Sequence, residues 1–190
     1  MAQTSTRVVI DDRRQRMRRI RSLSRVMAAG CLVASGLLTA SMALYWTTTP
    51  TRILLSQVGI ANGQAAEIDF PVRALAFVIS MIPLGALAYG LLNARRCFKA
   101  FSVDNIFSRE PTRHLRAFAV AVAVSALLKP FAGAALSVLL SASSSAGAKT
   151  LVLNIGSDTL IALIFSGTVA VIAWVMTEAS DVSDENKQFV

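Results

Sequence analysis

The chain has 190 residues, of which 54% are hydrophobic and only 16% are charged, with a formal net charge of +8. Soluble domains carry about 25% charged residues, and here the apolar residues gather in four long blocks. This composition excludes a soluble globule, an intrinsically disordered chain and a disulfide scaffold.

The four apolar blocks predict four transmembrane helices, at residues 26–46, 74–92, 117–140 and 151–176. The first block has 21 residues without a charge. A helix of that length rises roughly 31 Å, enough to cross the hydrocarbon core of a bilayer. None of the blocks alternates polar and apolar residues as the strands of a membrane barrel do. The sequence therefore predicts an all-α, polytopic membrane protein.

Charged segments flank the predicted four-helix domain, residues 26–176. Residues 1–25 are basic, and the tail, residues 177–190, is acidic with a net charge of −3. A basic segment before an apolar one is also typical of a cleaved signal peptide. The first block is long enough to span a bilayer, so we expect a retained helix.

The positive charges are distributed asymmetrically between the two sides of the predicted bundle. Eight Lys and Arg lie in residues 1–25, six in 93–116 and one in the tail, against two in 47–73 and one in 141–150. The positive-inside rule places the side richer in Lys and Arg in the cytoplasm. We therefore expect a multi-pass protein of the cell inner membrane with both termini cytoplasmic.

The basic N-terminal segment indicates a partner on that side. Its arginines immediately precede a membrane helix, where each contributes about 1 kcal/mol to the attraction by anionic lipid. A sequence pI near 10.5 would also fit nucleic-acid binding. We expect membrane lipid with anionic headgroups to be the partner, and no direct contact with nucleic acid.

Two charges interrupt the apolar blocks: Lys129, which precedes Pro130, in the third block and Asp158 in the fourth. A charge in the middle of a membrane helix costs about 3 kcal/mol on insertion scales, so the two side chains are candidates for a buried ion pair. Two alternatives stay open. Lys129 extends its stem to the surface while Asp158 caps a shorter helix, or the pair lies on a transport or proton path.

A candidate cytoplasmic surface combines basic, aromatic and acidic residues. Aromatic side chains alternate with charges in residues 93–116, which is typical of a segment at the headgroup boundary. The acidic tail can continue the fourth helix and face these arginines. The residues expected to bind a partner or lipid here are Arg95, Arg96, Phe98, Phe101, Phe107, Arg113, Glu185 and Asn186.

Small residues recur four positions apart within the predicted helices. The pairs are Gly36 and Ala40, Ala86 and Gly90, Ala119 and Ala123, and Gly133 and Ser137. Because small side chains let helix backbones approach closely, we expect these pairs at contacts between helices.

No motif in the sequence indicates catalysis or a cofactor. The chain has no Gly-rich phosphate loop, nucleophile elbow or HExxH motif. Two cysteines with one histidine cannot complete a closed zinc site. His114, next to the membrane, is more simply an interfacial histidine than a proton relay. We expect no enzymatic activity, no cofactor and no metal.

The segment before the third helix and the acidic tail carry a family resemblance. The run Arg96-Cys97-Phe98-Lys99-Ala100-Phe101 is followed by Asn105-Ile106-Phe107-Ser108 and then by Leu115-Arg116, and the tail ends with Glu185-Asn186. Together they resemble DUF2975, a family of bacterial four-helix membrane proteins of unknown function. Asn105 stands where that family commonly has glycine. The resemblance implies no established activity, and it implies a small helix-turn-helix regulator as a partner.

Three functions follow from these features. The first is a non-enzymatic interaction or regulatory module with a cytoplasmic binding face. The alternative is a small transporter or channel component that uses Lys129 and Asp158 in a homo-oligomer. A membrane enzyme is disfavoured, because the sequence shows no nucleophile, metal set or acid–base pair.

Overall fold

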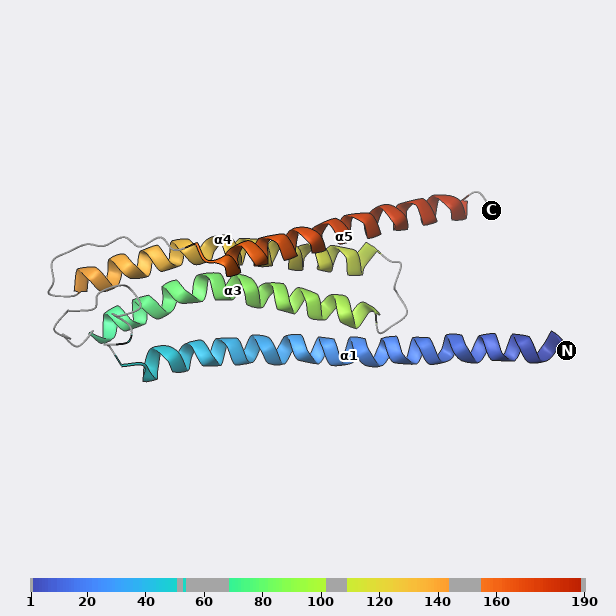
Figure 1. Cartoon of the computed structure of the whole chain (residues 1–190), viewed down its shortest axis with the longest axis horizontal. Helices are drawn as coiled ribbons and strands as arrows, with labels where there is room; N and C mark the ends of the chain where they lie inside the picture. The colour runs from blue at the N-terminus through green and yellow to red at the C-terminus, as the bar shows by residue number, and fades with distance from the viewer. Residues whose placement is uncertain (1, 51–52, 54–68, 102–108, 144–154, 189–190) are drawn as a thin grey trace.

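The computed structural model describes residues 2–50, 53, 69–101, 109–143 and 155–188. Its helices are α1 (Ala2–Thr48), α3 (Phe70–Phe101), α4 (Arg109–Ser143) and α5 (Ser157–Gln188), shown in Figure 1. Each contains a stretch long and apolar enough to cross a membrane: Arg21–Thr48, Phe70–Ala100, Glu110–Ala142 and Ser157–Val182. The prediction of an all-α protein with four transmembrane helices is confirmed.

The helices extend past the predicted boundaries at most ends. No helix break separates the basic segment from the first span or the last span from the acidic tail, since α1 and α5 run through both junctions. The predicted start of the fourth helix at Leu151 is wrong. Ile155 and Gly156 are not helical, and α5 begins at Ser157; residues 151–154 lie outside the described residues. Hydropathy alone misses this boundary, because apolar residues continue upstream of the polar first turn.

Local sequence explains where α3 begins. The side chain of Asp69 accepts a hydrogen bond from the backbone N–H of Phe70 at 3.2 Å, and its carbonyl accepts one from Val72 N–H at 3.0 Å. Pro71 is tolerated in the first turn, where its missing N–H has no partner to lose. Asp69 is therefore the N-cap of α3.

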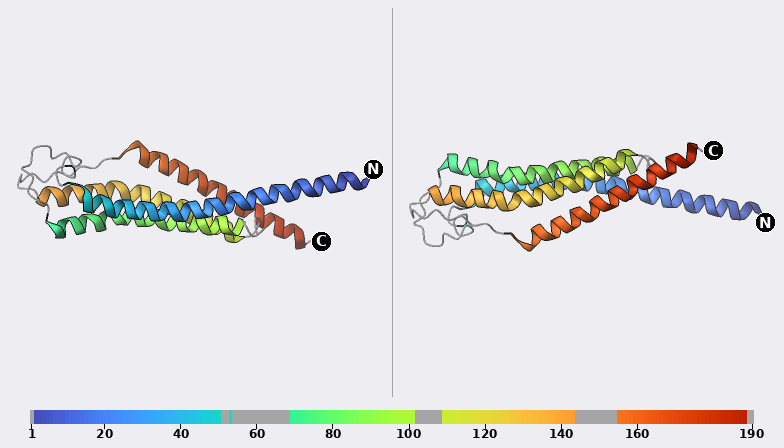
Figure 2. Two further views of the ribbon diagram at one scale, coloured as in Figure 1. Left: turned by 90° about the horizontal axis from the view of Figure 1, so that it is seen from below. Right: turned by 90° about the horizontal axis from the view of Figure 1, so that it is seen from above.

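The helices pack as an open row. α3 packs against both α1 and α4, and α4 packs against α5, whereas α1 and α5 share no comparable interface. α5 crosses α4 obliquely, with its N-terminal end standing away from the other helices (Figure 2). The row therefore has α1 at one edge and α5 at the other, and many large apolar side chains remain exposed. Exposure of this kind suits contact with lipid.

Small side chains fill most of the interfaces. The fully or nearly buried residues are mainly alanine and serine, from Ala28 in α1 to Ser180 in α5. Larger residues meet at one end of the row, where Trp46 and Ala76 pack with Met42, Tyr45, Phe77, Leu136 and Leu139. Close packing of small residues is the usual way in which membrane helices associate.

Both termini lie at the same end of the molecule. The C-terminal end of α3 and the N-terminal end of α4 are also at this end, which we call the terminal end (Figure 1). The N-terminal part of α1 and the C-terminal part of α5 project beyond α3 and α4 there, as both further views show (Figure 2). An even number of spans requires this arrangement of the termini.

Candidate functional site

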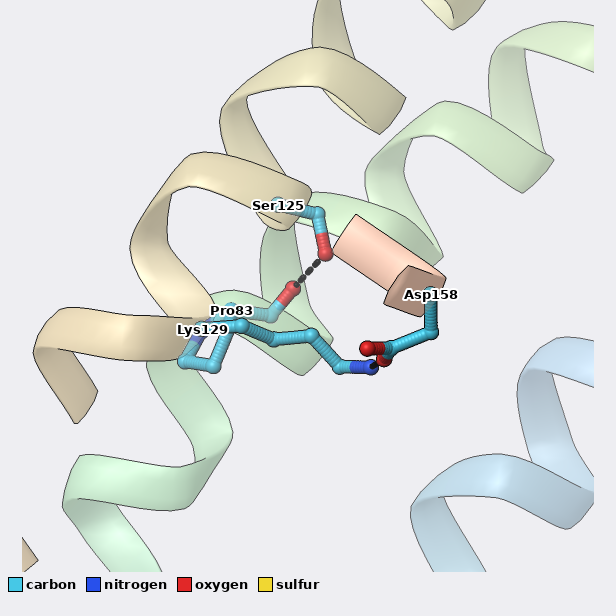
Figure 3. Close-up of polar contacts among 4 residues, drawn as sticks. All are labelled: Pro83, Ser125, Lys129 and Asp158. Carbon is cyan, nitrogen blue, oxygen red and sulfur yellow. Dashed lines mark hydrogen bonds and ion pairs between the residues drawn. The ribbon is translucent and has the colours of Figure 1, made fainter. Parts of the chain in front are cut away.

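Lys129 and Asp158, the two charges inside the apolar blocks, lie together in the structure. Lys129 projects from α4 and Asp158 from the first turn of α5 (Figure 3). The Nζ of Lys129 donates to Oδ2 of Asp158 at a distance of 2.5 Å. The structure therefore joins the two helices through an ion pair between residues 29 positions apart in the chain.

Asp158 also occupies a position that favours a carboxylate. It is the second residue of α5, where backbone N–H groups lack helical partners and the helix dipole attracts negative charge. The side chain of Asp158 folds back over Gly156. A Cβ atom added at Gly156 would overlap Oδ1 of Asp158, so glycine leaves the space that this carboxylate occupies. Asp158 thus serves the start of a helix and the ion pair at once.

Other parts of the described protein do not cover this pair. The side chain of Lys129 is 58% exposed and that of Asp158 is 63% exposed. The reason is the open row: the N-terminal end of α5 stands away from the other helices, so no other described helix covers the contact (Figure 2). The pair therefore faces the surroundings of the protein, within helices that can span a membrane.

A second polar contact lies one turn from Lys129. The hydroxyl of Ser125 is buried and donates to the carbonyl of Pro83 in α3 at 2.7 Å (Figure 3). Pro83 and Pro130 lie inside α3 and α4, where each removes a helical hydrogen bond. Within one turn of α4, Ser125 thus contacts α3 and Lys129 contacts α5, so polar side chains of α4 link all three helices at this height.

A groove lies nearer the terminal end, between α3 and α4. It has a volume of about 500 Å³ and is lined by Ala86, Tyr89, Arg113, Arg116, Ala117, Val120, Ala121 and Val124. The helix backbones approach closely beside it, since a Cβ atom at Gly90 would meet the Cβ of Ala121 at 3.0 Å. The groove combines two cations with an apolar floor.

The residues of the candidate cytoplasmic surface gather at the terminal end as far as the structure describes them. Arg95 and Phe98 are half-buried on the last turns of α3, Arg96 is exposed beside them, and Arg113 is exposed on the second turn of α4. Phe107 lies outside the described residues. Phe101 ends α3, and Glu185 and Asn186 lie in the last turns of α5, but their side chains are not among those described.

Two polar contacts have no counterpart in the sequence analysis. Asn93 is almost fully buried in α3. Its Oδ1 lies 3.2 Å from Nδ1 of His114 in α4, and its Nδ2 donates to the carbonyl of Tyr89 at 2.9 Å. At the opposite end, the guanidinium of Arg73 donates to the carbonyls of Trp46 and Thr49 at 3.4 and 3.1 Å. An Asn directly after an apolar block signals a contact of the first kind, because a buried amide requires partners.

Within the described ranges, no three His, Cys, Asp or Glu side chains come together in a way that would hold a metal ion. Cys31 and Cys97 are free, the first half-buried in α1 and the second buried in α3.

Comparison with known proteins identifies a family and no function. A family model described as "Protein of unknown function (DUF2975)" matches residues 57–190, which confirms the resemblance carried by the segment before α4 and by the acidic tail. The match leaves out α1. No curated protein and no solved structure matches the chain.

Proposed function

Because the chain belongs to the DUF2975 family, whose function is unknown, we propose its role from its own geometry: a non-enzymatic inner-membrane protein whose cytoplasmic face binds a protein partner. The observation that carries this proposal is the length of α1 outside its apolar stretch. The helix starts at Ala2, whereas the uncharged block that can cross a membrane starts at Val26. About 24 residues, roughly 36 Å of helix, therefore precede the apolar block.

Most helical stability in proteins comes from packing against neighbouring elements and not from the helix itself. The projecting part of α1 runs past the ends of α3 and α4 (Figure 1). A surface that packs against it would supply the missing stabilisation.

Charge indicates what kind of surface that is. Residues 1–25 hold eight arginines against two aspartates, so an acidic protein surface complements them. The projecting end of α5 has the opposite sign, with a net charge of −3 over residues 177–190. A partner with both an acidic and a basic patch would contact the two projections together. A small helix-turn-helix regulator, which the family resemblance implies, is the first partner to test.

The orientation of the protein has its own test. A reporter fused after Val190 should behave as cytoplasmic, and one inserted near Ser144 as external, because the terminal end carries fifteen of the nineteen Lys and Arg. Enzymatic reporters that are active on only one side of the membrane give the readout. The reverse pattern would place the proposed binding surface outside the cell and refute the proposal.

Partner binding is tested by site-specific photocrosslinking in cells. A crosslinking residue at Arg18, which is exposed, should capture one soluble protein, whereas the same residue at Leu37, exposed within the span, should capture none. The captured protein, once purified, should bind the full chain in nanodiscs less tightly as ionic strength rises. The double variant Arg18→Glu/Arg19→Glu should lose the crosslink. A crosslink that survives the charge reversal, or capture of lipid alone, would contradict the proposal.

A second candidate function rests on the exposed ion pair. Lys129 and Asp158 lie within apolar helices and are more than half exposed, as expected for groups that line a path in a homo-oligomer. Ion or proton flux into vesicles containing the purified protein, abolished by Asp158→Asn, would favour a transporter or channel component. A monomer without flux would exclude it.

A further inference from the structure

We infer that the groove between α3 and α4 binds one anionic diacyl phospholipid, with the phosphate at Arg113 and Arg116 and an acyl chain along α4. This inference rests on the membrane-spanning character of the helices and not on the protein partner proposed above. Its first support is the shape of the groove, which encloses about 500 Å³ and runs along one stripe of α4.

The two arginines occupy the depth at which headgroups lie. The uncharged run of α4 begins at Ala117, directly after Arg116. Basic residues that border the apolar part of a spanning helix lie at the level of the lipid headgroups. Arg113 and Arg116 are in that position, and both are exposed.

The rest of the groove is suited to hydrocarbon. Ala117, Val120, Ala121 and Val124 continue the same stripe at spacings of three and four residues. Alanines on both helices leave it hollow, while Val120 and Val124 are 53% and 41% exposed and so open to the surroundings. From Arg116 to Val124 the stripe is about 12 Å long, which follows a lipid chain as it leaves the headgroup.

The charges around the groove favour an anion. Arg113 and Arg116 bring two positive charges to the same side of the second and third turns of α4. Glu110 precedes them by one turn, so the arginines leave this stretch net positive. His114 lies against Asn93 of α3 and is not among the lining residues. Basic pockets between membrane helices commonly bind anionic lipid headgroups.

The test is the binding of dioleoyl phosphatidylglycerol to the full chain in detergent, followed by native mass spectrometry and by thermal stability. The wild type should retain one lipid and gain thermal stability, and dioleoyl phosphatidylcholine should do neither. The double variant Arg113→Gln/Arg116→Gln should bind phosphatidylglycerol roughly 30-fold more weakly, since each arginine near a lipid surface contributes about 1 kcal/mol.

Two further variants separate this site from general surface charge. Arg95→Gln/Arg96→Gln removes the same charge from the same end of the molecule at residues that do not line the groove, and it should weaken binding much less than Arg113→Gln/Arg116→Gln does. Val120→Trp fills the apolar part while both arginines remain, and it should weaken binding by at least tenfold. Wild-type affinity in the Arg113/Arg116 variant or in Val120→Trp, or an equal loss in the Arg95/Arg96 variant, would overturn the inference. Full stabilisation by inorganic phosphate would also overturn it, because a free anion would then account for the site.

Discussion

Replacing Lys129 by Met should lower the melting temperature of the protein in lipid nanodiscs by roughly 6–12 °C, because the carboxylate of Asp158 loses the cation 2.5 Å away. Both side chains are more than half exposed, so the loss of one leaves the other charge facing the surroundings of the protein. Asp158→Asn should cost a similar amount, since it leaves the ammonium of Lys129 facing lipid. Each stranded group can escape part of this cost by changing its protonation.

The pair is distinguished from two independent contacts by a double-mutant cycle. Lys129→Met/Asp158→Asn removes both charges and should recover most of the stability lost by either single variant. Lys129→Arg keeps the cation and should stay near the wild type. Additive losses would mean that the two residues do not stabilise each other in a bilayer, and Asp158 would then act only at the start of α5.

Gly90→Leu should destabilise the contact between α3 and α4 by about 1–3 kcal/mol. Gly90 is buried, and a Cβ atom there would meet the Cβ of Ala121 at 3.0 Å and the carbonyl oxygen of Phe118 at 3.5 Å. A leucine therefore forces the helices apart. Gly85→Leu is the matched control, because Gly85 lies on the same helix and nothing described lies within 4 Å of a Cβ there. It should be neutral or slightly stabilising, as leucine has the higher helix propensity.

Cys97 reports on this change without an added label. Its side chain is 1% exposed, so it should react with a thiol-reactive dye only when the helices separate. In a Cys31→Ser background, dye labelling during a thermal ramp should begin at a lower temperature in Gly90→Leu than in the wild type, and at the wild-type temperature in Gly85→Leu. Equal onsets for the two glycine variants would show that Gly90 is not a site of close packing.

The sequence predicts the number and approximate position of the spanning helices because hydropathy acts locally. A run of apolar residues longer than a bilayer core is wide crosses it, whatever its neighbours do. The same reasoning misplaces the start of α5. The apolar residues before Gly156 satisfy hydropathy, but the helix begins at the polar first turn with Ser157 and Asp158, where backbone N–H groups gain a carboxylate.

Patterns of small residues predict helix packing less well. Of the four pairs, Ala86 and Gly90 border the α3–α4 contact, where Gly90 approaches Ala121, and Ala119 and Ser137 of two other pairs are also buried. Gly36 and Gly133 would each place a Cβ atom in open space among the described residues. Spacing by four positions defines a face of a helix but does not say which face meets a neighbour. That depends on how the helices are arranged.

The sequence by itself determined the membrane class, the four spans, the positive charge of residues 1–25 and the negative charge of residues 177–190. Each of these depends on the composition of a local segment. It also made Lys129 and Asp158 candidates for an ion pair, since charges in apolar helices need a partner, and the structure shows the contact. Only the tertiary structure decided that the pair is exposed and that Arg113 and Arg116 border a groove. The physical reason is the open row, in which α5 contacts α4 without meeting α1. The burial of a side chain and the shape of a groove depend on contacts between helices. The hydropathy of a single helix does not predict these contacts.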